Sequence, residues 1–392
     1  MRGLVTATDR LDLIQKAFIE HEFEMVVVNQ SDILDGENNF NLTKLITGES
    51  LGEIENKIRK MIELGEINFC VSTTGYDNGA IWDAKIGELC NAHDIIFMGH
   101  KVSTAKLCIN KAKTKEVLKQ QNILVPDGRV CNNELELRCI MREYQDIPIV
   151  LKEIEGISGR GMFLINTNQN QDLSFVKYPI LAEIFIEGIE ISVDVYSRGD
   201  IFFMYPPVYK GKTDKNKFEH PLKKVRSCPY ILPKHLNEKL ISVVKKITNI
   251  TKSVHWLNID IVIKGDEFYI LEINSRFSGT SRLCYYATDI NPYSIVLSSM
   301  KGNRIYNYVD MGRKISFELP IFKKIDYPIT NSVHIYYSKS QIASLGRITF
   351  SLDLMDKEYK TNIESLIRKV SGMEYATEID KQYNNFVQFF QT

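Results

Sequence analysis

The sequence has no excess of charge of either sign and no apolar run long enough to cross a membrane. Its 49 basic and 49 acidic side chains balance each other over 392 residues, so a nucleic-acid polyanion is not expected as the main partner. The longest apolar stretches, such as residues 180–186, are interrupted by charge well before the roughly 20 residues that a membrane helix needs. The residues after Met1 also lack a leader-like apolar segment. We therefore expect a cytoplasmic protein without membrane or nucleic-acid partners.

Paired cysteine motifs and the dinucleotide fingerprint are absent as well. The seven cysteines stand singly, with no Cys-x-x-Cys pair. This pattern is typical of reduced, buried thiols and argues against a disulfide framework or a zinc site. The first strand-like segment runs into Thr6-Ala7-Thr8-Asp9 without a G-x-G-x-x-G sequence. A dinucleotide site of the Rossmann type is therefore not expected.

What the sequence does contain is an alternation of short apolar runs and amphipathic stretches in its N-terminal part. Strands are predicted at 3–7, 25–28, 69–72 and 95–98, and helices at 51–64 and 80–90. This alternation is typical of a parallel sheet with helices on both faces, which is a Rossmann-like unit of the α/β class. A chain of this length is expected to form two or three packed units.

The remainder of the chain is less regular. Helices are predicted at 104–121 and 236–251, and strands at 148–152, 162–165 and 189–196. Residues 209–225 are rich in lysine and poor in pattern, so they are interpreted as a mobile surface loop with solvated charges. After about residue 305 we predict only some strands and a helix around 357–370, without a functional site.

The segment 257–283 carries the clearest chemical signal. Glu272 and Asn274 are two residues apart on one predicted strand, so both side chains point to the same face. A three-residue loop at 265–267 would pair Asp260 with Glu272 and Asn258 with Asn274, whereas a two-residue turn would send Asp260 to the other face. In the first register Asp260, Glu272 and Asn274 present oxygen ligands that suit Mg²⁺.

Polar residues continue past the end of this strand. Arg276 is placed where a guanidinium could grip a transferring phosphoryl group or an acyl phosphate. Ser278 and Gly279 then offer a hydroxyl group and close backbone approach to a substrate. The alternative is an ordinary hairpin with exposed polar side chains.

The chain contains an acidic residue, then Glu-x-Asn-x-Arg, and then Ser-Gly-Thr. This order of residues resembles the pattern at the end of the second half of the domain in the ATP-grasp superfamily. The likeness extends over about residues 100–300 and includes the lysines of Asn110-Lys111 and Val150-Leu151-Lys152. It implies that Lys111 and Lys152 contact the phosphates of ATP, although Lys106, Lys113 and Lys115 compete with Lys111 for that role. It also implies nucleotide contacts from the loop residues Ser158, Gly159 and Gly161, from Glu183, Ile184 and Ile186 at the adenine, and from Glu190 at the ribose hydroxyls.

The resemblance further implies a metal site and a domain plan. Asp260, Glu272 and Asn274 would hold one or two Mg²⁺ or Mn²⁺ ions, and Arg276, Ser278 and Gly279 would form the catalytic group. The implied fold is α/β, with α+β character in the C-terminal half. Its domains would be a Rossmann-like unit at 1–103, a small subdomain at 104–185, and a large subdomain with a C-terminal extension at 186–392.

The branch that this chain resembles is the carboxylate-amine ligases, including amino-acid and dipeptide ligases. The expected reaction joins a small-molecule carboxylate to an amine through an acyl phosphate and releases ADP and phosphate; the amine is expected to be an amino acid. D-alanine-D-alanine ligases are similar at the hinge, but they typically carry an arginine where this chain has Asn258, and they lack one at Arg276. A bicarbonate-using carboxylase, a kinase and a non-catalytic ATP-binding regulatory protein stay open, and a homodimer is compatible with the resemblance.

Overall fold

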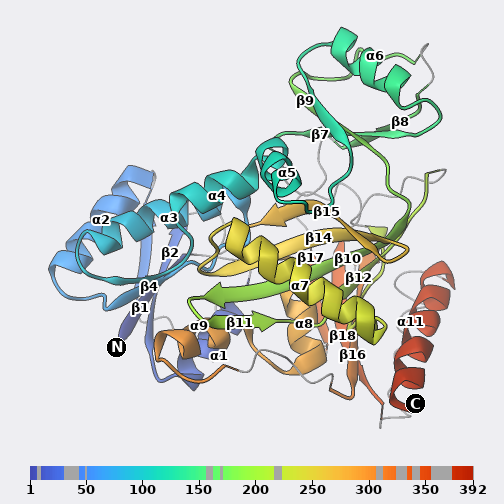
Figure 1. Ribbon diagram of the computed structural model, residues 1–392. Helices are drawn as coiled ribbons and strands as arrows, with labels where there is room; N and C mark the ends of the chain where they lie inside the picture. The colour runs from blue at the N-terminus through green and yellow to red at the C-terminus, as the bar shows by residue number, and fades with distance from the viewer. Residues whose placement is uncertain are drawn as a thin grey trace.

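The computed structural model describes the chain in eleven stretches, and these contain three β-sheets (Figure 1). The described residues are 1–6, 10–30, 44–48, 51–155, 162–167, 171–215, 223–305, 312–323, 333–337, 345–354 and 373–391. The strands of the three sheets fall into the segments 1–103, 104–185 and 186–392. The domain boundaries themselves stay a prediction.

The first sheet is parallel, in the order β3-β2-β1-β4-β5. Its elements are β1 (Arg2–Thr6), α1 (Leu11–Glu20), β2 (Glu24–Gln30), β3 (Lys44–Gly48), α2 (Leu51–Glu63), β4 (Phe69–Val71), α3 (Asp77–Asn91) and β5 (Ile96–Met98). Leu4 packs with residues of α2 and α3, whereas Val5 packs with residues of α1. Both faces of the sheet are therefore buried, which explains the uninterrupted apolar runs in its strands. The predicted strand-helix alternation is confirmed.

The second sheet is small and has the order β6-β9-β7-β8. Two helices, α4 (Val102–Ile109) and α5 (Lys111–Gln120), lead into β6 (Gly128–Cys131), α6 (Glu134–Glu143), β7 (Ile149–Glu153), β8 (Phe163–Ile165) and β9 (Ile180–Ile184). The single helix predicted over 104–121 is wrong, because Asn110 leaves the helical conformation at φ −89° and ψ 95° and caps α5 by accepting from the Lys113 N–H. This break places Lys111 at the first turn of α5.

The third sheet is the largest, and all the strand pairs described in it are antiparallel. Its strands are β10 (Gly188–Arg198), β11 (Ile201–Met204), β12 (Val208–Thr213), β13 (Arg226–Cys228), β14 (Trp256–Lys264), β15 (Glu267–Asn274), β16 (Lys314–Ile321), β17 (Val333–Tyr337) and β18 (Gly346–Asp353). Its accompanying helices are α7 (Lys234–Ile250), α8 (Ser281–Thr288), α9 (Pro292–Met300) and α11 (Met373–Gln391). The helix predicted at 357–370 lies outside the described residues, and α11 was not predicted. No helix in the described stretches has the length and apolar character to span a membrane.

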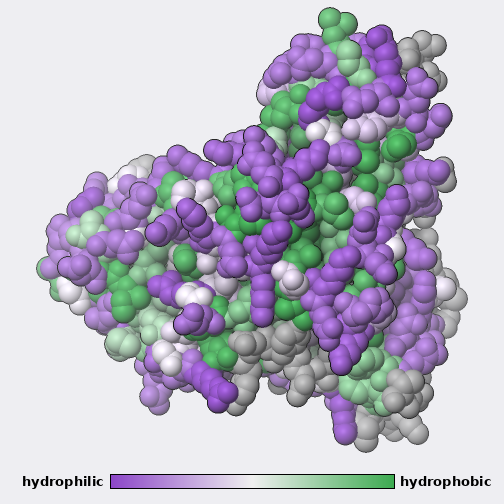
Figure 2. Space-filling model, viewed as in Figure 1, coloured by the Kyte–Doolittle hydropathy of each residue, from purple (hydrophilic) through white to green (hydrophobic). Residues whose placement is uncertain are grey.

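One part of the sequence interpretation is wrong in this sheet. Residues 209–225 were interpreted as a surface loop with solvated charges, but β12 runs through 208–213, and Lys210 is only 8% exposed. The lysines misled the interpretation because a lysine is exposed by default. The face shown in Figure 2 is covered mostly by hydrophilic side chains, as a lysine-rich sequence leads one to expect, so the burial of Lys210 needs its own explanation.

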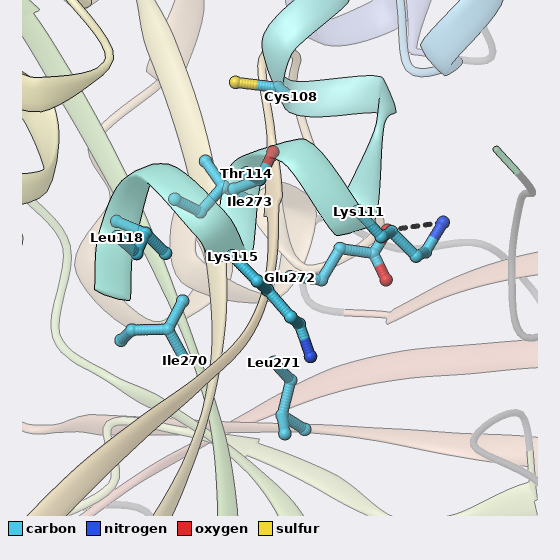
Figure 3. Close-up of a pocket in the computed structure, with 9 residues that line it drawn as sticks. All are labelled: Cys108, Lys111, Thr114, Lys115, Leu118, Ile270, Leu271, Glu272 and Ile273. Carbon is cyan, nitrogen blue, oxygen red and sulfur yellow. Dashed lines mark ion pairs between the residues drawn. The ribbon is translucent and has the colours of Figure 1, made fainter. Parts of the chain in front are cut away.

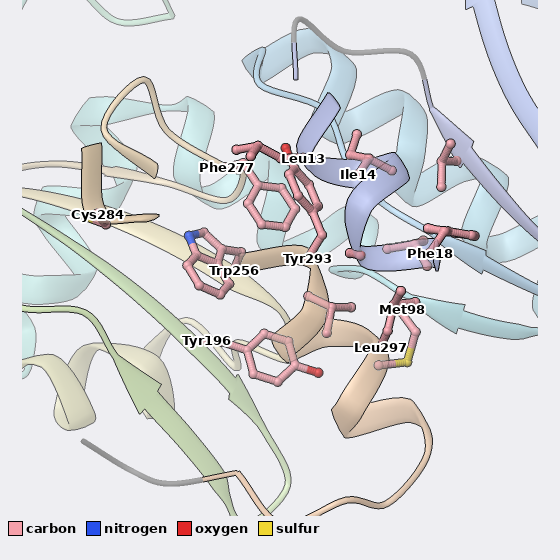
Figure 4. Close-up of a cluster of buried hydrophobic side chains, with 14 of the residues drawn as sticks. Leu13, Ile14, Phe18, Met98, Tyr196, Trp256, Phe277, Cys284, Tyr293 and Leu297 are labelled. Atoms are coloured by element: carbon pink, nitrogen blue, oxygen red, sulfur yellow. The ribbon is translucent and has the colours of Figure 1, made fainter. Parts of the chain in front are cut away.

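A shared aromatic core joins the first sheet to the third (Figure 4). Phe18 of α1 and Met98 of β5 belong to the same buried cluster as Trp256, Phe277 and Tyr293. The Trp256 and Phe277 rings stack at a centroid distance of 5.2 Å, and the Phe277 and Tyr293 rings lie 4.3 Å apart. Such aromatic packing stabilises the docking of the two units. The N-terminal unit is thus held against the strand ends where Asn274 and Arg276 lie.

Gly3 offers a direct test of packing in the N-terminal sheet. A Cβ atom at Gly3 would lie 2.4 Å from the Phe69 ring and 2.8 Å from the Phe18 ring, so we expect Gly3→Ala to lower the free energy of unfolding by about 1–3 kcal/mol. Gly52→Ala is the matched control, because it is exposed on α2 with no atom within 4 Å, and it should be neutral or stabilising by up to about 1 kcal/mol. Urea unfolding of both variants measures the difference, and equal stabilities would contradict the described packing.

Candidate active site

The hairpin of β14 and β15 brings the predicted metal ligands to one face. Asp260 pairs with Glu272 and Asn258 pairs with Asn274, as predicted. The predicted three-residue loop is wrong, because Lys264 pairs with Glu267 across a two-residue turn. The register shifts by one residue between Asp260 and Ile261, and Leu271 is the extra residue on β15. This bulge restores the pairing that the turn alone would have destroyed.

Each of the two carboxylates faces a lysine. Glu272 Oε1 lies 3.9 Å from Lys111 Nζ, and Asp260 Oδ2 lies 2.8 Å from Lys210 Nζ. Figure 3 shows Lys111 of α5 directed toward Glu272 of β15. Burial raises the pKa of Glu272, Lys111 opposes this, and the charge of Asp260 raises it further. The two carboxylates therefore lie close enough to repel each other, as residues that share a cation do.

This arrangement fits a magnesium-type ion better than a cage made of protein ligands alone. Within the described residues, no group of three or more His, Cys, Asp or Glu side chains could hold a metal ion. The site offers two carboxylates and the Asn274 amide. Such a small set of protein ligands suits Mg²⁺, because water and phosphate oxygens complete its coordination shell. The Asn274 Oδ1 atom currently accepts from Arg276 Nη2 at 3.3 Å.

Glu183 is buried between two lysines rather than open to a base. Its carboxylate pairs with Lys115 and, at 2.9 Å, with Lys152 Nζ, and the residue is 1% exposed. Burial lowers the pKa of Lys115 to about 7 against the attraction of Glu183. For Glu183, burial would raise the pKa, but the two ammonium groups outweigh burial and lower it. The Glu183 side chain thus forms ion pairs with both lysines, as a buried carboxylate needs charged partners, and the predicted contact of Glu183 with adenine stays a prediction.

The hinge backbone is partly engaged as well. The Ile184 N–H donates to the Asp127 carbonyl at 2.8 Å, and the Ile186 carbonyl accepts from the Thr213 hydroxyl at 2.8 Å. An adenine ring would have to use the other backbone atoms of these two residues. The predicted loop residues Ser158, Gly159 and Gly161 lie outside the described residues.

Glu190 forms ion pairs with two lysines of the segment that was interpreted as a loop. Its carboxylate lies 3.0 Å from Lys210 Nζ and 2.9 Å from Lys224 Nζ. Burial opposes its charge, but these two ammonium groups lower the pKa of Glu190 to about 2. Lys210 therefore bridges Glu190 and Asp260. Sequence reasoning missed both lysines, although the alternation Lys224-Val225-Arg226-Ser227-Cys228 could have indicated a strand.

Arg276 is held by the N-terminal unit. Its Nε donates to Asp77 Oδ1, at the first residue of α3, and its Nη1 donates to the Phe277 carbonyl at 3.3 Å. The Arg276 and Asp77 side chains are 12% and 8% exposed. The prediction placed Arg276 at the strand end but gave no partner, since Asp77 lies 199 positions away in the sequence.

The serine side chains that follow Arg276 point into the protein. Ser278 Oγ donates to Asp194 Oδ2 at 2.8 Å, and Ser281 Oγ donates to the same atom at 3.1 Å. The Ser278 hydroxyl thus serves the buried Asp194 carboxylate in this structure, and its predicted contact with a substrate stays a prediction. Gly279 lies near Arg226, whose Nη1 is 3.7 Å from the position of a Cβ at Gly279.

Comparisons with known proteins agree with the fold. The family model described as "ATP-grasp domain" matches residues 108–280. The carbamoyl-phosphate synthase of Methanobrevibacter smithii is 25% identical over 264 residues, covering 65% of this chain and 70% of that protein. The carbamoyl phosphate synthase large chain of Thermotoga petrophila is 26% identical over 235 residues, covering 56% of this chain and only 21% of that protein. This chain therefore spans about a fifth of the length of that large chain.

A solved structure is similar over nearly the whole length. The L-amino acid ligase of Bacillus licheniformis superposes with a TM-score of 0.72 at 15% sequence identity, covering 94% of this chain and 97% of that chain. At this identity the likeness concerns the fold. The predicted fold class, an ATP-grasp fold with an N-terminal parallel-sheet unit, is confirmed.

The Glu190 ion pairs predict a pH-dependent stability. In Glu190→Gln two buried ammonium groups lose their shared carboxylate, so we expect a loss of roughly 3 kcal/mol in the free energy of unfolding above about pH 5. The folded pKa of about 2 lies below the ordinary value of 4.5, so the stabilisation in the wild type is lost as the pH falls from 4.5 toward 2. The two proteins should then converge. Urea unfolding between pH 7 and the acid limit of the folded state measures this.

Glu143→Gln is the control for that series. Glu143 pairs with Arg129 at 2.7 Å, but both side chains are about half exposed, so its loss should change stability little at any pH. A Glu190→Gln deficit that does not depend on pH would contradict the assigned ion pairs.

Proposed function

We propose that this chain is an ATP-dependent ligase that joins a carboxylate to an amine, because residues 108–280 match the family model described as an ATP-grasp domain. The observation that supports the proposal most directly is the shared face of Asp260, Glu272 and Asn274, with Lys111 opposite. Oxygen ligands for a divalent cation and lysines for phosphates are the two requirements of phosphoryl transfer from ATP.

In this proposal, separate groups of residues bind the phosphates and the metal ions. Lys111 and Lys152 bind the phosphates of ATP, and Asp260, Glu272 and Asn274 hold one or two Mg²⁺ or Mn²⁺ ions. The metal, when bound, supplies neutralisation of the phosphate charge. Each lysine already contacts a carboxylate, Lys111 at Glu272 and Lys152 at Glu183.

The reaction itself takes place in two displacement steps. An oxygen of the acceptor carboxylate attacks the terminal phosphorus of ATP, and the bond to ADP breaks. The amine nitrogen then attacks the carbonyl carbon of the acyl phosphate, phosphate leaves, and the nitrogen gives up a proton. The Arg276 guanidinium would stabilise negative charge on the transferring phosphoryl group, since a guanidinium matches the geometry of phosphate oxygens. We propose an amino acid as the amine, because the fold resembles that of an L-amino acid ligase over nearly its full length.

A second candidate is activation of a smaller acid, such as bicarbonate. It is favoured by the likeness of 65% of the chain to a protein named carbamoyl-phosphate synthase. The two candidates differ in what ADP release requires. The ligase releases ADP and phosphate in equal amounts only with both a carboxylate and an amine, whereas the second candidate releases ADP with bicarbonate alone.

The deciding experiment measures ADP and phosphate from Mg²⁺ and ATP with the purified chain, against pooled carboxylic acids and amino acids. Mass spectrometry of the products accompanies it. A new mass equal to the acid plus the amine less water supports the ligase. A stable phosphorylated product without free phosphate would indicate a kinase, and tight ATP binding without any turnover would indicate a regulatory protein.

Glu272→Gln tests the metal face. The amide keeps the shape of the side chain but removes one metal carboxylate, so we expect kcat to fall by about 100-fold or more with the fold intact. Glu267→Gln, exposed at the start of the same strand, is the matched control and should keep normal turnover. Circular dichroism checks the fold of both variants, and near-normal turnover in Glu272→Gln would place the metal site elsewhere.

A further inference from the structure

Asp77 is a buried carboxylate, and its position in the N-terminal unit does not explain why its charge is buried. It is the first residue of α3 and is 8% exposed. Tyr76 is the N-cap of this helix and makes no side-chain cap hydrogen bond. An acid in the first turn gains up to about 1 kcal/mol from the helix dipole. Burying a carboxylate costs more than that unless a cation compensates it.

The compensating cation comes from the catalytic strand end. Arg276 Nε donates to Asp77 Oδ1, Arg276 Nη2 donates to Asn274 Oδ1 at 3.3 Å, and Arg276 Nη1 donates to the Phe277 carbonyl at 3.3 Å. All three guanidinium nitrogens are thus engaged. Within the described part of the chain, Asp77 is the only carboxylate in an ion pair with Arg276. The orientation of the guanidinium therefore depends on a residue of the N-terminal unit.

A second carboxylate lies within electrostatic reach of Arg276. This carboxylate is Glu272, which stands two residues before Asn274 on the same face of β15, and the Asn274 Oδ1 atom accepts from Arg276 Nη2 at 3.3 Å. Without Asp77, the guanidinium would lose its counter-ion and would be attracted to Glu272. An arginine paired with Glu272 would compete with a divalent cation for the same carboxylate.

We propose that Asp77 is a positioning residue that holds the Arg276 guanidinium toward the reacting phosphoryl group and keeps it away from Glu272. The inference rests on the proposed function for the catalytic role of Arg276. It adds that the N-terminal unit supplies part of the active site rather than only a surface for the substrate.

The first arm of the test is kinetic. Asp77→Asn should lower kcat about 10- to 100-fold, the usual range for a residue that orients another, and it should leave the KM for ATP within about twofold. Asp77→Glu, which keeps the charge, should recover part of the loss. In an Arg276→Gln background, Asp77→Asn should have no further effect, because the two residues act as one unit. Asp94→Asn, exposed beyond the other end of α3, is the control.

The second arm needs no turnover. Affinity for Mn²⁺ in the presence of ADP, measured by electron paramagnetic resonance, should fall about tenfold in Asp77→Asn. It should return to the wild-type value in the double variant with Arg276→Gln, because the competing guanidinium is then gone. Thermal unfolding of each variant confirms that it is folded at the assay temperature.

The outcomes separate the two proposals. If no acid and amine give turnover but the Mn²⁺ affinity falls and is restored as expected, the ligase proposal fails and the positioning by Asp77 stands. If the ligase is active but Asp77→Asn is additive with Arg276→Gln, or the Mn²⁺ affinity does not change, the positioning proposal is overturned.

Discussion

The candidate site depends on one extra residue in a hairpin. Leu271 lies opposite no residue of β14, and this shift sets Glu272 and Asn274 opposite Asp260 and Asn258. Because side chains alternate along a strand, a regular continuation from the two-residue turn would have put the two carboxylates on opposite faces. Bulges re-aim side chains in this way at many functional sites. The lysines at Glu272 and Asp260 and the hydrogen bond between Asn274 and Arg276 all follow from this register.

The arrangement also brings together residues of two sheets and of one helix of the N-terminal unit. The small sheet supplies Lys152 and Glu183, the large sheet supplies Asp260 and Glu272, and α3 of the N-terminal unit supplies the carboxylate of Asp77. The aromatic cluster around Trp256 and Phe277 fixes the N-terminal unit against β14. A rigid apolar core thus stands directly behind the polar groups, which is how closely spaced charged side chains are held in place.

Local patterns allowed the sequence to predict part of this site, and the missing part is tertiary. Asp260 was paired with Glu272, and Asn258 with Asn274, by assuming a three-residue loop. That pairing is right although the loop is wrong, because the two-residue turn and the bulge at Leu271 together give the same register. The Leu271 bulge could not be predicted, since any hydrophobic residue there fits either register. Lys210 was interpreted as solvated because nothing near it in the sequence indicates its partners. These partners are Glu190 on β10 and Asp260 on β14, which reach Lys210 only when the strands pair in the sheet. Contacts between domains, such as the one made by Arg276, leave no periodic signal at all.

The lysines and carboxylates of the candidate site also bear on how a nucleotide would arrive. Among the described residues of the site, five lysines (Lys111, Lys115, Lys152, Lys210 and Lys224) are paired with four carboxylates (Glu183, Glu190, Asp260 and Glu272), which leaves an excess of one positive charge. Charges that neutralise each other within a few ångströms produce a weak field at the distance of a Debye length, about 8 Å at physiological salt. The protein as a whole has no net charge either. For the nucleotide binding proposed above, these charges would therefore add little long-range steering to ordinary diffusion, and we expect an association rate that depends little on ionic strength.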